Sequence, residues 1–346
     1  MGNAVGVLYG LVPWLWYSIV SNDNEEAIQK RKRITDEVLS TERTYSESLS
    51  SCVNEIVVPL LDGNDQLLST GDAKKIFGKL VTVNDTHIAF YSELQRYVDK
   101  NKPVGALFVS YEEEFKVNYS SFVNSYNAAL RMLSQRRQAS DNFDQFLHEK
   151  KVKVNNQEVE SILIMPVQRL PRYVMLLKDL LKHTPNYTRH RKITEEALET
   201  MTEVTRFVND EKRIAEQQHE IMEVQESLSS SSEVLVKRGR YIVKKGTLAV
   251  QNKSSLMQYV LFNDLILFTT ESSMSKLANM IHVSDSHKLK EKDRCPLAVF
   301  KVELMDPEVN VAIVKTENNK WRLKFRSTEE MADWNSLIAE TAKTCS

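Results

Sequence analysis

The sequence predicts a multidomain chain: an all-α elongated helical bundle, then a small antiparallel β-barrel capped by a C-terminal α-helix. Three observations predict it. From about residue 25 to 228, apolar residues recur at three- and four-residue steps. Composition changes abruptly at the serine-rich run "SLSSSSEV", residues 227–234, and beyond it the apolar period becomes two. A last amphipathic stretch follows near the C-terminus. We therefore place the domains at 1–24, 25–228 and 229–346.

Composition narrows the classes of protein to consider. A chain of 346 residues with 42% hydrophobic and 27% charged residues can bury two ordinary cores. Its 46 Lys+Arg and 47 Asp+Glu give a net charge of −1, so we predict no nucleic-acid partner. The three cysteines are scattered, which argues against a disulfide framework or a zinc cluster and favours a reducing, cytoplasmic setting.

The amino-terminal segment, residues 1–24, is unusually apolar. Its stretch "AVGVLYGLVPWLWYSIV", residues 4–20, carries no charge and is borderline in length for a bilayer span. Pro13, the two tryptophans and the lack of a preceding basic region argue against a spanning helix or a signal peptide. The start "MGNAVG" resembles an N-myristoylation signal, but Gly6 stands where Ser or Thr is usual. Two placements stay open: docking on the protein's own surface, and contact with a membrane interface.

Helical periodicity defines the first domain. One stripe predicts a helix that ends near Pro59 and a "DGND" turn at 62–65; it consists of Ile34, Val38, Thr41, Tyr45, Leu49 and Ile56. Further helices are predicted over residues 72–100, 103–119, 121–134 and 141–150. In the stretch 161–185 the expected buried seam is Leu170, Val174, Leu177 and Leu181, with Pro171 kinking the first turns. The last helix is predicted to run for about 35 residues or more, roughly 50 Å, so part of it leaves the bundle.

Two hairpins and a helix define the last domain. Residues 259–269 read as two strands around an Asn263-Asp264 turn, and residues 309–325 as a second hairpin around Asn318-Asn319. A polar loop is expected over residues 272–296. Ser327 and Glu330 form a predicted capping box, and the helix that follows places these residues on one face: Met331, Trp334, Leu337 and Ile338.

Motifs for covalent or metal chemistry are missing from the sequence. It contains no phosphate-binding loop, dinucleotide fingerprint, zinc-protease motif or nucleophile elbow. Of its seven histidines only His282 and His287 are close neighbours, and they lie in a polar stretch without acidic or cysteine partners at ligand spacing. We therefore predict no catalytic residue in the covalent sense, no metal and no cofactor.

Three blocks of the first domain resemble the Dbl-homology domain, the catalytic module of Rho-family guanine nucleotide exchange factors. The most characteristic is "MPVQRLPRYVMLLKDLLKHTP", residues 165–185. Residues 34–49, "ITDEVLSTERTYSESL", resemble the family's first block, and residues 204–213, "VTRFVNDEKR", the start of the exposed part of its last helix. The strands and the helix with Trp334 resemble the pleckstrin-homology domain that follows in tandem. Residues 235–248, "LVKRGRYIVKKGTL", resemble the junction in the faciogenital-dysplasia or frabin-like branch.

The resemblance implies exchange on a Rho-family GTPase (Rho, Rac or Cdc42) in signalling to the actin cytoskeleton. The factor would stabilise the nucleotide-free GTPase and thereby speed GDP release and GTP loading, without covalent chemistry. It implies that Glu42 engages switch I, that Arg172 engages switch II and that Asn209 adds a contact from the last helix. Four residues would flank them: Gln168, Met175, Leu176 and Lys178. From its spacing, Glu42 is expected to lie off the apolar stripe with its charge free.

Other expectations concern partners and alternatives. Only Lys244, Lys245 and Lys253 mark the first hairpin of the second domain, so phosphoinositide or membrane contact there is expected to be weak. The frabin-like junction favours Cdc42. The chain is expected to be cytoplasmic, with recruitment to membrane or cytoskeleton, and a fragment of a longer protein. Two alternatives stay open: a non-catalytic scaffold or membrane adaptor, and an exchange factor autoinhibited by residues 1–24.

Overall fold

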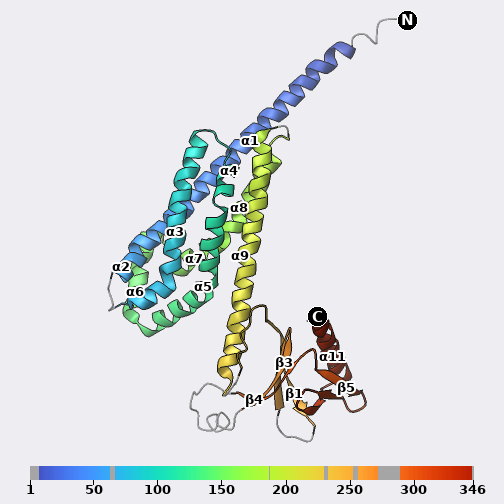
Figure 1. Ribbon diagram of the computed structural model, residues 1–346. Helices are drawn as coiled ribbons and strands as arrows, with labels where there is room; N and C mark the ends of the chain where they lie inside the picture. The colour runs from blue at the N-terminus through green and yellow to red at the C-terminus, as the bar shows by residue number, and fades with distance from the viewer. Residues whose placement is uncertain are drawn as a thin grey trace, which may run out of the picture. The chain divides into compact units, whose positions relative to one another are not determined.

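The computed structural model describes residues 8–344 apart from 63–66, 187, 230–232, 252–255 and 272–288, with side chains from Glu25 onward except that of Arg189. It divides into two compact units, residues 1–212 and 213–346. The first is helical and the second contains the sheet (Figure 1). The all-α bundle and the β-rich domain predicted from the sequence are both present.

The first unit is built from long helices joined by short turns. A π-helical turn, η1 (Val53–Val57), follows α1, and a 3-10 turn, η2 (Lys151–Val154), follows α6. The helices are α1 (Leu8–Cys52), α2 (Val58–Leu61), α3 (Thr70–Asp99), α4 (Gly105–Ser110), α5 (Glu112–Ala139), α6 (Asp141–Lys150), α7 (Val159–Leu163), α8 (Met165–Lys182) and α9 (Arg189–Ser227).

From Leu8 onward, the described part of the amino-terminal segment belongs to α1, which runs through Pro13. The two placements predicted for residues 1–24 depend on side chains that lie outside the described residues. Over the part of the chain that the structure describes, no helix combines the length and apolar character needed to cross a membrane. The predicted "DGND" turn falls largely on residues 63–66, which are also outside it.

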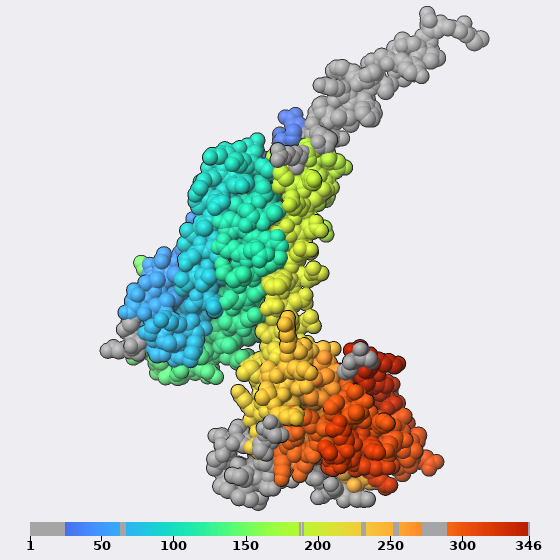
Figure 2. Space-filling model, viewed as in Figure 1, coloured from blue at the N-terminus to red at the C-terminus, as the bar shows by residue number. Residues whose placement is uncertain are grey.

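The core of the first unit is rich in aromatic side chains. The rings of Phe90, Phe108 and Phe115 are fully buried, and Phe108 packs edge-on against Tyr173 with ring centroids 5.1 Å apart. Gly105 in α4 allows a close approach to α9, because a Cβ there would lie 2.9 Å from the carbonyl oxygen of Ile193. On the face shown in Figure 2, α3 and α5 form one continuous surface. This packing holds α1, α3, α5 and α8 around a shared interior.

Two predicted details of the bundle differ from the structure. The predicted break near residue 120 is absent from the described helix α5, and the break comes earlier, at Tyr111 between α4 and α5. The second concerns helix α8, which continues through exposed Pro171, where the predicted kink stays a prediction. Its inward face is Leu170, Tyr173, Leu176, Leu177 and Leu180, so Val174 and Leu181 of the predicted seam are only half-buried.

The second unit is an antiparallel sheet with a helix packed on it. The strand order is β4-β3-β2-β1-β7-β6-β5, and among the described residues β4 and β5 are not paired, so hydrogen bonds do not close the predicted barrel. The elements are β1 (Ile242–Val250), β2 (Leu256–Phe262), β3 (Leu265–Glu271), β4 (Leu289–Pro296), β5 (Lys301–Asp306), β6 (Val311–Lys315), β7 (Lys320–Lys324) and α11 (Thr328–Lys343).

Trp334 of α11 fills the centre of this unit. It is 2% exposed, and its ring lies 5.4 Å from that of Phe325 and 6.1 Å from that of Tyr259. Ser327 Oγ accepts a hydrogen bond from the Glu330 backbone amide, which confirms that Ser327 caps the helix as predicted. Both predicted hairpin turns are confirmed, since β2 and β3 flank residues 263–264 and β6 and β7 flank residues 318–319.

The predicted loop over residues 272–296 is partly wrong. Residues 289–296 form β4, while residues 272–288 are outside the described part. Asp293 is 5% exposed and accepts hydrogen bonds from Thr316 Oγ1 (2.7 Å) and Trp321 Nε1 (2.8 Å). Its burial shows that the charged stretch is an integral strand.

The last turns of α9 belong to the second unit. Ile221, Val224 and Leu228 pack with Val260 and Phe262 of β2 in a separate apolar cluster. The two compact units therefore divide within α9, at Lys212, upstream of the serine run where the sequence predicted the domain boundary.

Candidate functional site

Helix α8 presents an exposed ridge that we define as Gln168, Arg172, Met175 and Lys178. Steps of four, three and three residues place them on one helical face. The Met175 side chain is 71% exposed. Among the residues that the structure describes, no acidic group lies within ion-pair distance of Arg172 or Lys178. The ridge therefore combines unpaired positive charge with an apolar tip.

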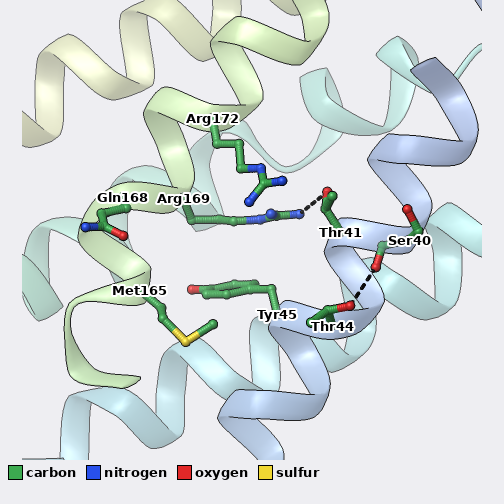
Figure 3. Close-up of a pocket in the computed structure, with 8 residues that line it drawn as sticks. All are labelled: Ser40, Thr41, Thr44, Tyr45, Met165, Gln168, Arg169 and Arg172. Atoms are coloured by element: carbon green, nitrogen blue, oxygen red, sulfur yellow. Dashed lines mark hydrogen bonds between the residues drawn. The ribbon is translucent and has the colours of Figure 1, made fainter. Parts of the chain in front are cut away.

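Two hollows lie on either side of this ridge. The first, about 360 Å³, separates α8 from α1 and is lined by Ser40, Thr41, Thr44, Tyr45, Met165, Gln168, Arg169 and Arg172 (Figure 3). The second, about 400 Å³, separates α8 from α9 and is lined by Pro171, Val174, Thr202, Thr205, Arg206, Asn209 and Asp210. The structure thus brings Arg172 and Gln168 to one hollow and exposed Asn209 to the other.

Glu42 is not the free surface charge that the sequence predicted. It is 0% exposed. Its Oε2 accepts hydrogen bonds from Arg169 Nη2 (2.5 Å), Arg169 Nε (3.1 Å) and the Tyr173 hydroxyl (2.5 Å), and its Oε1 lies 2.7 Å from His87 Nδ1. The reason is the helical face: Val38, Glu42 and Tyr45 point inward together, whereas Thr41, assigned to the stripe, is half-buried at its edge.

A buried polar cluster surrounds this carboxylate, and we define it as Glu42, His87, Tyr119, Arg169 and Tyr173. His87 Nε2 lies 2.7 Å from the Tyr119 hydroxyl, so both ring nitrogens of His87 have partners. The Arg169 guanidinium lies over the rings of Tyr45 (5.0 Å) and Tyr173 (4.6 Å). A buried ion pair of this kind is stable only when its hydrogen bonds are satisfied, as they are for Glu42.

The cluster reaches the surface through Arg169. Its Nη2 lies 3.4 Å from Thr41 Oγ1, and Figure 3 shows the guanidinium extending below Arg172 toward Thr41. Arg169 is only 3% exposed but lines the hollow between α1 and α8. The buried carboxylate therefore fixes the side chain that forms the floor of that hollow.

Electrostatics keep the Glu42 carboxyl ionised. Burial alone would raise its pKa, but the charges of His87 and Arg169 and hydrogen bonds from His87 and Tyr173 outweigh burial and lower the pKa to about 2. Burial, together with the Glu42 charge, raises the pKa of the Tyr173 hydroxyl well above its ordinary value. At neutral pH the carboxylate stays charged and the phenol stays neutral.

Leu176 also lies elsewhere than predicted. It is 8% exposed and faces the core together with Tyr173 and Leu180, so it is not part of the ridge surface. Conversely, Arg169 and His87 are structurally central and were not singled out in the sequence. For Arg169 the sequence does contain an indication: it precedes Tyr173 by four positions and Leu176 by seven, so it lies on the same helical face as these residues.

The basic residues predicted to contact lipid in the second unit differ in their surroundings. The Lys245 ammonium pairs with Glu220 at 2.7 Å, whereas exposed Lys244 has no ion pair among the described residues. Lys253 is outside the described part. In the residues that the structure covers, no group of three or more histidine, cysteine or acidic side chains is arranged to hold a metal ion.

Comparison with known proteins supplies the family. A model described as "RhoGEF domain" matches residues 34–209, just over half of the chain. Two curated relatives are the Dictyostelium discoideum "Guanine exchange factor for Rac 30", 30% identical over 267 residues (75% of this chain, 16% of the relative), and the Homo sapiens "Protein ECT2", 28% identical over 194 residues (54% and 21%). The chain thus spans about a fifth of the length of these relatives.

Solved structures share the fold of most of the chain. The linker-DH/PH domains of p115-RhoGEF match with a TM-score of 0.74 at 18% identity, covering 92% of this chain and 98% of that one. The DH/PH domains of PDZ-RhoGEF, solved in complex with RhoA, match with a TM-score of 0.69 at 16% identity, covering 91% and 94%. These likenesses confirm the predicted fold class, a helical bundle followed by an antiparallel sheet with a C-terminal helix, as in a pleckstrin-homology domain.

Proposed function

Because the chain belongs to the RhoGEF domain family, we propose that it is a guanine nucleotide exchange factor for a Rho-family GTPase. The observation that supports this most directly is the α8 ridge, which lies within the matched residues and carries unpaired Arg172 and Lys178 between two hollows. Such a surface suits a protein partner, because its charges have no counterpart among the described residues of the chain itself.

Exchange on this surface works by differential binding. The ridge binds the nucleotide-free GTPase more tightly than the nucleotide-bound form, and linkage then speeds nucleotide release. A thousandfold acceleration corresponds to about 4 kcal/mol. Two or three hydrogen bonds to charged groups, at about 1.5–3 kcal/mol each, supply that difference. No covalent step is needed.

We assign the roles by position. Arg172, with Gln168 and Met175, contacts switch II of the GTPase, and Lys178 and Asn209 add contacts farther along α8 and on α9. Glu42 acts from beneath the surface: it holds Arg169 and Tyr173 in place, so that switch I meets the α1 wall of the hollow at Ser40, Thr41 and Thr44. This replaces the direct contact between Glu42 and switch I that the family resemblance implied.

The proposal also names which Rho-family GTPase is the first candidate substrate. The junction over residues 235–248 resembles the frabin-like branch, which makes Cdc42 the first candidate. A relative named for Rac and a structural neighbour solved with RhoA extend the panel to Rac and Rho. We place the chain in the cytoplasm, with recruitment to the membrane or cytoskeleton where such GTPases act.

A fluorescent-GDP release assay over Rho, Rac and Cdc42 tests the proposal. The wild-type chain should accelerate release from at least one of them, and Lys178→Ala or Asn209→Ala should each reduce the rate by roughly tenfold, the loss of about 1.4 kcal/mol of transition-state binding. Lys79→Ala, an exposed lysine on α3, is the matched control and should leave the rate unchanged. Tight binding of a nucleotide-free GTPase without acceleration would instead indicate the scaffold.

A further inference from the structure

A second positively charged feature lies on α1, away from the ridge. It is a pocket of about 330 Å³ where the early part of α1 meets the turn between α3 and α4 and the beginning of α9. Figure 1 shows the start of α9 beside α1 at this end of the bundle. On α1 the pocket is lined by residues between Ile28 and Asp36, whereas the hollow under Arg172 is lined by residues between Ser40 and Tyr45, and the two share no lining residue. It is therefore separate from the hollow under Arg172.

Three cations converge on this pocket from two segments of the chain. Arg31 and Lys32 come from α1, and Lys102 comes from the α3–α4 turn. None of the three forms an ion pair among the described residues, and Asp36 is the single acidic side chain in the described lining. Neighbouring Lys30 differs, because its ammonium pairs with Glu26 at 2.7 Å. The pocket thus holds a local excess of positive charge in a chain whose net charge is −1.

The geometry of these cations suits an anion with several oxygens. Arg31 is half-buried, and its planar guanidinium can donate two parallel hydrogen bonds to a phosphate group. The Lys102 ammonium lies 5.3 Å from the centre of the Tyr97 ring, a contact that holds it near the pocket rim. Like charges held close together repel one another, and a bound anion would remove that repulsion.

The apolar part of the lining favours a lipid over a free phosphate compound. Ile28, Val98, Val104 and Leu180 line the same pocket, and the Ile28 side chain is 46% exposed. Upstream on the same chain, residues 4–20 carry no charge. Basic residues beside an apolar segment form the two-part signal that attaches proteins to anionic membranes.

We infer that this pocket binds the phosphate headgroup of an anionic membrane phospholipid, which makes the early part of α1 a membrane-docking end of the first unit. This site is distinct from the lysines of the first hairpin in the second unit. The inference does not depend on which GTPase is the substrate, nor on whether exchange occurs.

Vesicle sedimentation of the full chain tests the inference. Vesicles of phosphatidylcholine alone are compared with vesicles that also contain phosphatidylserine. The wild type should sediment with the anionic vesicles only, and Arg31→Gln/Lys32→Gln/Lys102→Gln should bind them roughly 100-fold more weakly, from the loss of three lipid-facing charges. The matched control removes three exposed charges elsewhere, Lys74→Gln/Lys75→Gln/Lys79→Gln on α3, and should change binding by less than about threefold.

Each other outcome overturns the inference. Equal losses in the two triple variants would indicate general charge attraction, and undiminished binding of the pocket variant would place the lipid contact elsewhere, as at Lys244. Binding of soluble inositol hexakisphosphate without binding to vesicles would identify a free phosphate ligand instead of a lipid. Circular dichroism checks that both variants are folded. GDP release in solution without vesicles should be unchanged in the pocket variant, so failure here is distinguishable from failure of the proposed exchange function.

Discussion

Helix α1 carries two charged regions that differ in one respect, the pairing of their charges. At Glu42 the carboxylate is fully buried and meets Arg169, His87 and Tyr173 within hydrogen-bonding distance. At Arg31 and Lys32, three turns earlier, the charges face a pocket and have no ion pair among the described residues. The comparison distinguishes two roles for a charged residue on this helix. A paired, buried charge maintains the shape of the bundle, and an unpaired charge is available to another molecule.

The largest expected effect is on the buried side of this comparison. Glu42→Ala leaves Arg169 buried without a counter-charge, so the free energy of unfolding should fall by about 3–5 kcal/mol. Urea unfolding followed by circular dichroism measures this. Glu37→Ala, an exposed glutamate on the same helix, should change stability by no more than about 0.5 kcal/mol. Equal stability of the two variants would show that the buried pair contributes nothing.

The same contrast holds for two apolar residues of α8. Leu177 is 0% exposed, and Leu177→Ala should lower the free energy of unfolding by about 2–5 kcal/mol through an internal cavity. Met175 is 71% exposed, so Met175→Ala should leave stability nearly unchanged and slow GDP release instead. Thermal unfolding and the release assay, run on both variants, separate the two effects. A destabilised Met175→Ala would contradict the assignment of Met175 to the ridge.

Acid should weaken the first unit through Glu42. The pKa of its carboxyl in the folded chain, about 2, is below the ordinary value of 4.5, so the folded state favours the ionised form. The resulting stabilisation is complete above the ordinary value and is lost as the pH falls from 4.5 toward 2, up to about 3 kcal/mol. Stability measured between pH 6 and pH 3 should fall more steeply in the wild type than in Glu42→Gln. Parallel curves would mean that Glu42 is not the titrating group.

The smallest effect is expected at the unpaired end of α1. Removing the three cations of the basic pocket should change the free energy of unfolding by no more than about 0.5 kcal/mol. Any change should be an increase at low salt, since mutual repulsion is relieved, and should disappear near 1 M salt, where the screening length is about 3 Å. A marked loss of stability would instead show that these cations have partners within the fold.

Local patterns in the sequence predicted most of the fold. The helical half, both hairpin turns, the Ser327 cap and the burial of Trp334 follow from short-range rules. Strand β4 was missed because an edge strand carries many charges, and "LKEKDRCP" therefore reads as a loop until Asp293 is seen bonded to Thr316 and Trp321.

The sequence predicted the exposed residues of the site correctly but not the buried ones. Arg172, Lys178, Met175, Gln168 and Asn209 are exposed as expected. Glu42 was assigned to the wrong face because Thr41 and Glu42 both fit a spacing of three and four residues between Val38 and Tyr45. Glu42 rather than Thr41 is buried because Arg169 binds its carboxylate, and Arg169 is 127 positions away in the sequence. Helical periodicity alone does not identify a contact at that separation.

The buried polar cluster also constrains how this sequence can evolve. Its members come from α1, α3, α5 and α8, and each single loss strands a charge or a hydroxyl in the interior. Positions 42 and 169 should therefore covary across descendants, either kept together or replaced together by apolar residues. The residues of the exposed ridge do not depend on one another in this way, so each can be replaced separately as the GTPase partner changes.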